Sequence, residues 1–233
     1  MNHKPEILFE DKDLLICRKP AGIATQTKRL GQQDMESLLK NYRAKKGEPP
    51  YIGIVHRLDQ PVEGVMVFAK NQKAAAGLSK QVQDRVIGKY YYAVSASRTE
   101  ANEGVLEDYL FTDKKANFTQ VVDKETGENR LEAKYAKLEY KVVETKEDKT
   151  LFDIQLHTGR QHQIRVQMAH MGCPLVGDGK YNVQQDIEGK SNFNTGLALC
   201  SYKLEFEHPT KKIPMQFEIK PLGEAFSRFF IDK

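Results

Sequence analysis

The chain contains few cysteines and no long apolar segment. Its three cysteines, Cys17, Cys173 and Cys200, are odd in number and widely spaced, and none belongs to a paired motif. Thiols of this kind are typical of cytosolic proteins, in which disulfides are rare. The N-terminus lacks an apolar run of signal-peptide length, and no later segment approaches the roughly eighteen apolar residues of a membrane span. We therefore expect a cytoplasmic protein that is neither secreted nor embedded in a membrane.

The chain also lacks internal repeats, low-complexity tracts and a linker long enough to divide it. With 233 residues it has the size of one catalytic domain. Lys and Arg outnumber Asp and Glu by only 36 to 32, an excess that suits a polyanionic partner without requiring one. Between residues 28 and 46, however, six basic side chains face two acidic ones. Such a patch could neutralise phosphates, and it is equally compatible with a solvated helix face.

Short strand patterns dominate the chain. The apolar run of residues 65–70 predicts a buried strand, and the alternation of Phe152, Ile154 and Leu156 with polar residues predicts a strand with one buried face. Turn sequences join such patterns into hairpins. The predicted hairpins comprise residues 133–157 and 196–220, and the predicted helices comprise residues 35–45, 73–83 and 224–230. Many hairpins and few crossover helices indicate an α+β fold with a largely antiparallel mixed sheet and flanking helices.

Residues 112–130 form the most loop-like region of the sequence. They are polar and contain a "TGEN" turn. We expect a loop exposed to solvent here, with a hairpin arm as the alternative.

The stretch "HTGRQHQIR" predicts a helix with polar groups at its start. Thr158 and Gln161 are spaced as a capping box, so the helix should begin directly after His157. The free N–H groups at that start, together with Arg160 and His162, would form a phosphate site.

Arg165 lies within the same predicted helix. Ile164 and Met168 are four residues apart and can anchor the helix to the core. An unpaired guanidinium is costly to bury, so we expect an acidic partner for Arg165 elsewhere in the chain.

Three histidines in this region, His157, His162 and His170, raise the possibility of a metal site. Their spacing does not match the pair of ligands four residues apart in zincins, and no acidic ligand follows at a fixed offset. The cysteines are also distant in sequence. We therefore expect no metal.

The stretch "HRLDQPVEG" predicts a rigid loop in front of the buried strand. Pro61 cannot continue a helix or donate to a strand ladder, and Gly64 permits an unusual backbone angle. Rigid loops of this kind often carry reactive groups. Asp59 is the candidate, although its local sequence is equally compatible with a turn cap or a pair with Arg57.

Three motifs together resemble the RluA-type family of RNA pseudouridine synthases. They are "IVHRLDQPVEGVMVFAK", "KYYYAVS" and "HTGRQHQIRVQMAHMGCPLVGDGKY". The resemblance extends to both ends of the chain and implies the pseudouridine synthase fold, with a central catalytic cleft. It further implies that residues 1–233 are a single catalytic domain without a separate S4-like RNA-binding domain.

The resemblance assigns roles to individual residues. Asp59 corresponds to the family's catalytic aspartate, Tyr91 to its base-stacking tyrosine, and Arg165 to the arginine that pairs with the catalytic carboxylate. Tyr90 and Tyr92 fall on the opposite face of the strand, where packing is expected. The residues expected to contact RNA or substrate are His56, Arg57, Arg160, His162 and Gln163. The family's chemistry implies no cofactor and no metal, and RNA as the partner, with ribosomal RNA favoured over transfer RNA. We expect a monomer.

Two departures from the family pattern keep alternatives open. Val62 and Glu63 replace a usual Thr-Ser pair, and Cys200 replaces a common histidine. The charge of Glu63 would lie near the expected path of the RNA. One alternative is an RNA-binding protein that has kept the fold and lost the reaction. Another is a hydrolase that uses Asp59 and Glu63 as its two carboxylates.

Overall fold

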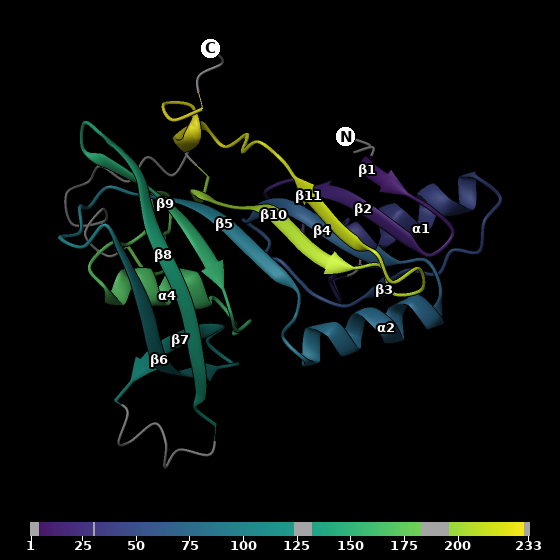
Figure 1. Cartoon of the computed structure of the whole chain (residues 1–233), viewed down its shortest axis with the longest axis horizontal. Coiled ribbons are helices and arrows are strands. Elements are labelled where there is room, and N and C mark those ends of the chain that lie inside the picture. Colours follow the sequence, from purple (N-terminus) through teal and green to yellow (C-terminus); the bar gives the residue numbers. More distant parts are fainter. Residues whose placement is uncertain (1–4, 30, 124–131, 183–195, 231–233) are drawn as a thin grey trace. The chain divides into compact units, whose positions relative to one another are not determined.

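The computed structural model describes residues 5–29, 31–123, 132–182 and 196–230 (Figure 1). The chain forms two compact units. The first unit comprises Met1–Gly88 and Ser201–Lys220, and the second comprises Lys89–Cys200 and Pro221–Lys233. Each unit therefore combines segments that are far apart in the sequence.

The first unit is built on a sheet with β4 in its interior. Its strands follow the order β1 (Glu6–Glu10), β2 (Leu14–Lys19), β4 (Glu63–Ala69) and β10 (Leu199–Glu207), with β3 (Gly53–Ile54) paired to β4 and β11 (Pro214–Glu218) paired to β10. All residues of β4 are buried, which confirms the strand predicted from its apolar run. The predicted hairpin around the "HPTKK" turn is also confirmed, since β10 and β11 pair antiparallel.

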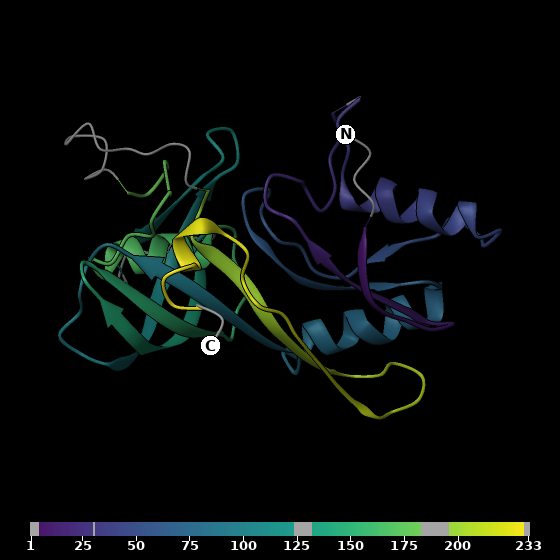
Figure 2. The ribbon, with the colours of Figure 1, turned by 90° about the horizontal axis from the view of Figure 1, so that it is seen from above.

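Two capped helices complete the first unit. α1 (Met35–Lys45) has the predicted bounds, and the Asp34 side chain accepts a hydrogen bond from the N–H of Ser37 at 2.8 Å. α2 (Gln72–Gln83) begins one residue before its predicted start. It lies beside the β10–β11 hairpin (Figure 2), where a Cβ added to Gly77 would meet the Cβ of Pro209 at 2.8 Å. The absence of a side chain at Gly77 thus permits this close packing.

The second unit contains an antiparallel sheet. Its strands follow the order β5 (Gly88–Ser95), β9 (Lys149–Leu156), β8 (Lys134–Lys146), β6 (Glu103–Asp113) and β7 (Phe118–Val122). Each neighbouring pair in this order is antiparallel. The predicted hairpin of residues 133–157 is therefore confirmed.

The expectation of a solvent loop over residues 112–130 is wrong for the part that the structure describes. β6 extends to Asp113 and β7 begins at Phe118, so the chain forms the hairpin arm that was the alternative. The hydroxyl groups of Thr112 and Thr119 lie 3.0 Å apart across the two strands, and the backbone N–H of Thr119 donates to the Tyr181 hydroxyl. A bond within the hairpin and one to Tyr181 thus stabilise this polar segment as a strand. Residues 124–130 lie outside the described residues.

The capping box predicted at Thr158 is also wrong. α4 (Gln163–His170) begins later, and its N-cap residue is His162. The hydroxyl of Thr158 instead donates to Oε1 of Gln163 at 2.8 Å and accepts from the N–H of Lys137 at 2.8 Å. Because Thr158 is committed to β8 and to Gln163, the chain makes a further turn before it becomes helical. Ile164 and the fully buried Met168 do anchor α4, as predicted.

The remaining elements are short. The helix predicted over residues 224–230 is reduced to the 3₁₀ turn η1 (Glu224–Phe226).

Within the second unit, Leu110, Ala136, Val166 and Tyr181 form a buried apolar cluster. Antiparallel ladders with few helices confirm the predicted α+β class.

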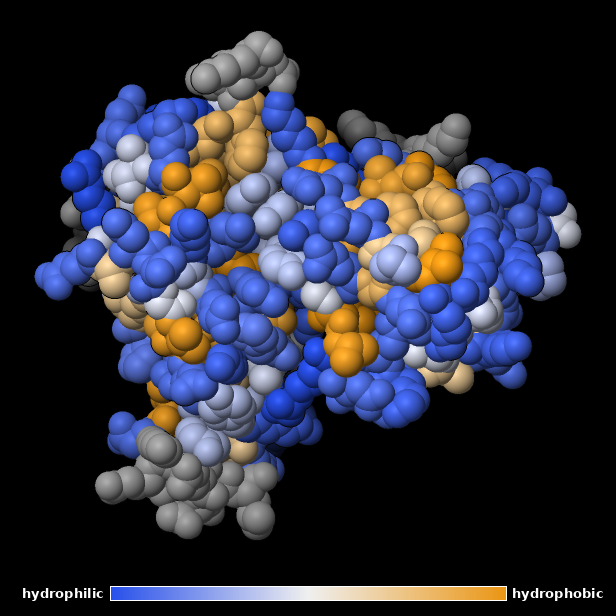
Figure 3. Space-filling model, in the orientation of Figure 1, coloured by the Kyte–Doolittle hydropathy of each residue, from blue (hydrophilic) through white to orange (hydrophobic). Residues whose placement is uncertain are grey.

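The face of the molecule in Figure 3 is mainly hydrophilic. On the face shown in Figure 3, hydrophobic residues occur in small groups among hydrophilic ones. No helix in the described part of the chain is both long and apolar enough to cross a membrane.

Candidate active site

Asp59 lies in a tight turn of the first unit, between β3 and β4. The backbone carbonyl of Asp59 accepts a hydrogen bond from the N–H of Val62 at 3.0 Å, which closes the turn around Pro61. Leu58 and Val62, which flank the turn, are both buried. Apolar packing on both sides thus fixes the backbone that carries the Asp59 carboxylate.

A second segment of the first unit holds this loop from the side. The Thr25 hydroxyl donates to the carbonyl of Leu58 at 3.0 Å and accepts from its N–H at 3.2 Å. The N–H of Gly22 donates to the carbonyl of Gln60 at 2.8 Å, and the Gln60 side chain returns a bond to the Gly22 carbonyl at 3.0 Å. Four hydrogen bonds therefore secure the residues on either side of Asp59, which confirms the predicted rigidity of the loop.

Lys19 is a site residue that the sequence analysis missed. It is fully buried at the end of β2, and its ammonium donates to the carbonyls of Pro20 at 2.8 Å and Gln60 at 3.1 Å. Burial lowers the pKa of Lys19 to about 8, although the negative charges of Asp59 and Glu63 oppose this shift. A cation thus lies within electrostatic range of the Asp59 loop. The position of Lys19 between an apolar strand and Pro20 was the sequence feature that could have indicated its burial.

Glu63 is buried, with 6% of its surface exposed. Its carboxylate lies 3.9 Å from the Arg18 guanidinium and interacts electrostatically with Lys19. Glu63 is therefore an interior carboxylate near two of the protein's own cations, and the position of its charge relative to the RNA stays a prediction.

His56 and Arg57 have different environments within the Asp59 loop. Nε2 of His56 accepts a hydrogen bond from the N–H of Val67 at 3.2 Å, so His56 anchors the start of the loop to β4. The side chain of Arg57 is exposed, whereas its neighbour Leu58 is buried. Arg57 is thus accessible to a large anionic ligand.

Tyr91 lies in the middle of β5, in the second unit. It pairs with Ile154 of β9 and is buried. The ring of Tyr92 packs 5.0 Å from the ring of Phe230, measured between centroids. This contact confirms the packing role predicted for Tyr92.

Arg165 has the buried acidic partner that its position predicted. Its Nε and Nη2 donate to Oδ2 and Oδ1 of Asp178, each at 2.7 Å, which is the planar two-point geometry of the strongest ion pairs. Asp178 was missed by the sequence analysis, and its position between two glycines in "GDGK" was the only signal. The pairing of Arg165 with Asp59 stays a prediction, and the two residues belong to different units.

Arg160, His162 and Gln163 shape the turn before α4. Nε of Arg160 donates to the carbonyl of Tyr135 at 2.9 Å, and Nδ1 of the buried His162 lies 2.8 Å from the Tyr181 hydroxyl. The amide of Gln163 accepts from Thr158 and from the N–H of Arg160, and it donates to the Lys137 carbonyl and to Gln167. An RNA contact by Gln163 would have to replace one of these four bonds.

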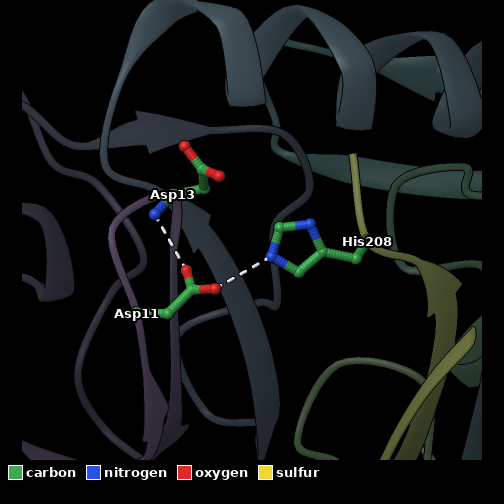
Figure 4. Close-up of side chains that lie close together, drawn as sticks. All are labelled: Asp11, Asp13 and His208. Carbon is green, nitrogen blue, oxygen red and sulfur yellow. Dashed lines mark hydrogen bonds and ion pairs between the residues drawn. The ribbon is translucent and has the colours of Figure 1, made fainter. Parts of the chain in front are cut away.

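One group in the described residues has the composition of a metal site: Asp11, Asp13 and His208 (Figure 4). Its donor atoms are already used within the protein. Oδ2 of Asp11 contacts Nε2 of His208 at 3.0 Å and the Lys211 ammonium at 2.6 Å, while Oδ1 accepts from the N–H groups of Asp13 and Leu14. Lys211 thus supplies the cation, and the group ties the β10–β11 turn to the β1–β2 turn.

Comparison with known proteins identifies the family. The sequence profile described as RNA pseudouridylate synthase matches residues 13–170, a range that includes Asp59, Tyr91 and Arg165. The chain belongs to the RluA-type family of RNA pseudouridine synthases. Like its family, it is an isomerase that acts on uridine in RNA.

Individual relatives agree with this assignment. The chain is 37% identical over 207 residues to the dual-specificity RNA pseudouridine synthase RluA of Vibrio vulnificus, and the match covers 88% of this chain and 78% of the relative. It is 33% identical over 226 residues to the RNA pseudouridine synthase MG209 of Mycoplasma genitalium, covering 97% of this chain and 69% of the relative.

A solved structure supports the fold. Human RNA pseudouridylate synthase domain containing 1 superposes with a TM-score of 0.76 at 19% identity, covering 95% of this chain and 85% of that one. The pseudouridine synthase fold predicted from the motifs is thereby confirmed.

Proposed function

We propose that Asp59 is the catalytic carboxylate of this synthase and that ribosomal RNA is preferred over transfer RNA. The observation that carries the first part is the Asp59 loop, which buried neighbours and the Thr25 and Gly22 hydrogen bonds hold in one conformation. Pseudouridine formation breaks the N1–C1′ bond, turns the uracil and joins C5 to C1′. A single positioned carboxylate can serve as the nucleophile or as the base that removes a sugar proton.

Tyr91 and Arg165 have separate roles in this proposal. The target uridine must leave its stack to reach Asp59, and the ring of Tyr91 would stack on the flipped base, a contact typically worth about 1–3 kcal/mol. Arg165 would pair with the Asp59 carboxylate and keep it ionised. The two-point bond to Asp178 supports this role, because it holds one edge of the guanidinium in place.

Contacts to the RNA backbone are proposed for Arg57, Arg160 and His162, with His56 and Gln163 beside them. The exposure of Arg57 supports its contact with phosphate or with the space that the flipped base leaves. The hydrogen bonds of His56 and Gln163 support an indirect contribution, in which they set the shape of the two loops.

The proposal includes the remaining properties of the protein. We propose that residues 1–233 act as one catalytic domain, as a monomer, in the cytoplasm, with RNA as the partner and without cofactor or metal. The reaction changes no oxidation state, and the three cysteines are buried free thiols, which suits a reducing compartment.

Neither alternative gains support from the structure. Val62 and Glu63 were the reason to consider a protein that binds RNA without modifying it, and both residues are buried. A hydrolase would need Glu63 as a second carboxylate, yet Glu63 lies beside Arg18. Release of free uracil would nevertheless identify a hydrolase.

The RNA preference can be tested by mapping pseudouridine directly. Unmodified ribosomal and transfer RNA would be incubated together with the protein, treated with a carbodiimide that labels pseudouridine, and copied by reverse transcriptase. We expect stops at discrete uridines of ribosomal RNA. The name of the Vibrio vulnificus relative indicates dual specificity, so stops in both RNAs would revise the preference, and stops in transfer RNA alone would contradict it.

A further inference from the structure

Tyr181 contacts the ion pair of Arg165 and Asp178 from a second direction. The Arg165 guanidinium lies over the Tyr181 ring, with Cζ 5.1 Å from the ring centroid. The backbone N–H of Tyr181 donates to Oδ1 of Asp178 at 3.2 Å, and Oδ1 is one of the two oxygens that bind Arg165. Asp178 therefore holds the edge of the guanidinium, and Tyr181 covers its face.

The Tyr181 ring is itself held in place. It is buried in the apolar cluster of the second unit and stacks on Phe118, with ring centroids 5.1 Å apart and an interplanar angle of 26°. Its hydroxyl accepts a hydrogen bond from the N–H of Thr119 at 3.0 Å. Burial raises the pKa of this hydroxyl, so it keeps its proton.

His162 forms a second hydrogen bond with this hydroxyl. Its Nδ1 lies 2.8 Å from the Tyr181 oxygen. The N–H of Thr119 donates to the same oxygen, so the Tyr181 hydroxyl is held from two sides. His162 has a φ of 52°, a left-handed conformation that is uncommon outside glycine, and at this backbone angle its buried ring meets the Tyr181 hydroxyl.

We propose that Tyr181 is a positioning residue for catalysis, which together with its bond to His162 holds the Arg165 guanidinium in the orientation that the catalytic carboxylate requires. This inference rests on the proposed role of Arg165. Asp178 holds the guanidinium at one edge, and a flat surface packed against its face resists rotation about that edge. Tyr181 supplies that surface, and the Thr119 and His162 bonds keep it from tilting.

Two substitutions separate the parts of this arrangement. Tyr181→Phe keeps the ring under Arg165 and removes the hydroxyl bonds, whereas Tyr181→Leu removes the aromatic face. A small displacement of a catalytic group can cost up to about 100-fold in rate, so we expect Tyr181→Leu to lower kcat by about 10- to 100-fold and Tyr181→Phe by only a few-fold. KM for RNA should stay constant in both. Leu151→Ala, a buried change on the strand that neighbours β5, is the control for lost packing.

A double substitution tests whether the effect passes through Arg165. Arg165→Lys removes the planar fork, so Tyr181→Leu should cause little further loss in that background. Independent, multiplicative losses would overturn the proposal. So would a Tyr181→Leu variant that melts at lower temperature, like Leu151→Ala, and yet keeps the wild-type kcat.

A measurement that does not depend on activity separates this inference from the proposed function. The Nε–H signal of Arg165 in ¹⁵N-labelled protein should exchange with water slowly in the wild type and in Tyr181→Phe, and faster in Tyr181→Leu. Unchanged exchange in Tyr181→Leu would overturn the positioning role. If the exchange rates were as expected but the wild-type protein modified no uridine, the catalytic role proposed for Arg165 would be wrong. The contact between Tyr181 and Arg165 would still be established.

Discussion

The buried lysine at position 19 shows how one residue adapts to the aspartate loop. An ammonium group loses its hydration when it is buried, and two carbonyl oxygens replace only part of it. The lowered pKa of Lys19 records this balance. The positive charge of Lys19 interacts favourably with the carboxylates of Asp59 and Glu63, which offsets part of the cost of burial.

Replacement of Lys19 by methionine should change how stability depends on pH. The pKa of Lys19 is 10.5 in its ordinary state and about 8 in the folded protein, so the unfolded chain binds more protons between these values. The free energy of unfolding of the wild type should therefore rise, relative to Lys19→Met, as the pH increases from 8 to 10.5. The full rise is on the order of 3 kcal/mol. Urea unfolding at several pH values measures it, and parallel curves for the two proteins would contradict the burial of a charged Lys19.

Asp11 should contribute stability that acid removes. Burial raises its pKa, but hydrogen bonds from Lys211, from the N–H of Asp13 and from His208 outweigh burial and hold the pKa of Asp11 far below its usual range. This stability is present at neutral pH and is lost as the pH falls towards the folded pKa. Asp11→Asn should lower the free energy of unfolding at pH 7 by about 1–3 kcal/mol, with a smaller effect at pH 3.

The exposed Asp84 offers a matched control for this change. It pairs with Lys80 at 2.9 Å on the surface of α2, where such pairs contribute little. Guanidinium unfolding of Asp84→Asn should therefore resemble the wild type at both pH values. If both substitutions lowered the free energy of unfolding equally, the hydrogen bonds of Asp11 would contribute no more to stability than a surface ion pair.

At the scale of elements, β4 and β10 approach each other closely at one glycine. A Cβ added to Gly64 would lie 2.4 Å from the Cβ of Ser201 and 2.8 Å from its backbone N and O. The backbone of Gly64 also has a φ of 157°. The strand that follows the Asp59 loop thus packs at a distance that only glycine permits.

Substitution of Gly64 by alanine should therefore destabilise the first unit. Backbone atoms of Ser201 cannot move aside as a flexible side chain would, so we expect a loss of about 1–3 kcal/mol, the range for overpacking. Thermal unfolding measures it. Gly196→Ala serves as the control, because nothing lies within 4 Å of a Cβ at that position. A Gly64→Ala protein as stable as Gly196→Ala would mean that the two strands can separate without cost.

Elements were predictable from the sequence where their own residues determine them. Helix α1 has a side-chain cap and helical spacing of apolar residues, and it was predicted with its bounds. The β6–β7 hairpin was only the alternative to a loop, and its hydrogen bond to Tyr181 joins residues distant in the sequence. The start of α4 was misplaced for a similar reason, since Thr158 bonds to Lys137 in β8.

The same distinction applies to the site residues. The rigid loop around Asp59 could be predicted because Pro61 lies within it, and the need of Arg165 for an acidic partner followed from the cost of burying a charge. The identity of that partner, Asp178, could not, since no local spacing links the two. The burial of Lys19 was equally hidden from local sequence.

At the scale of the whole molecule, the proposed catalytic residues come from both units. Asp59 belongs to the first unit, and Tyr91 and Arg165 belong to the second. The family match spans the chain from the first unit into the second, as the shared motifs do. The motifs in combination identify the family. The choice of RNA depends instead on the shape and local unstacking of the RNA itself.

The measurement that tests the account most directly is tritium release from RNA labelled at C5 of uridine. C5 must lose its hydrogen when it becomes the attachment to the sugar, so each modified uridine releases one tritium to water. We predict release by the wild type and by Asp84→Asn, and none by Asp59→Asn, which should still bind the same RNA in a filter-binding assay. Tritium release by Asp59→Asn at the wild-type rate would contradict the assignment of Asp59 as the catalytic carboxylate.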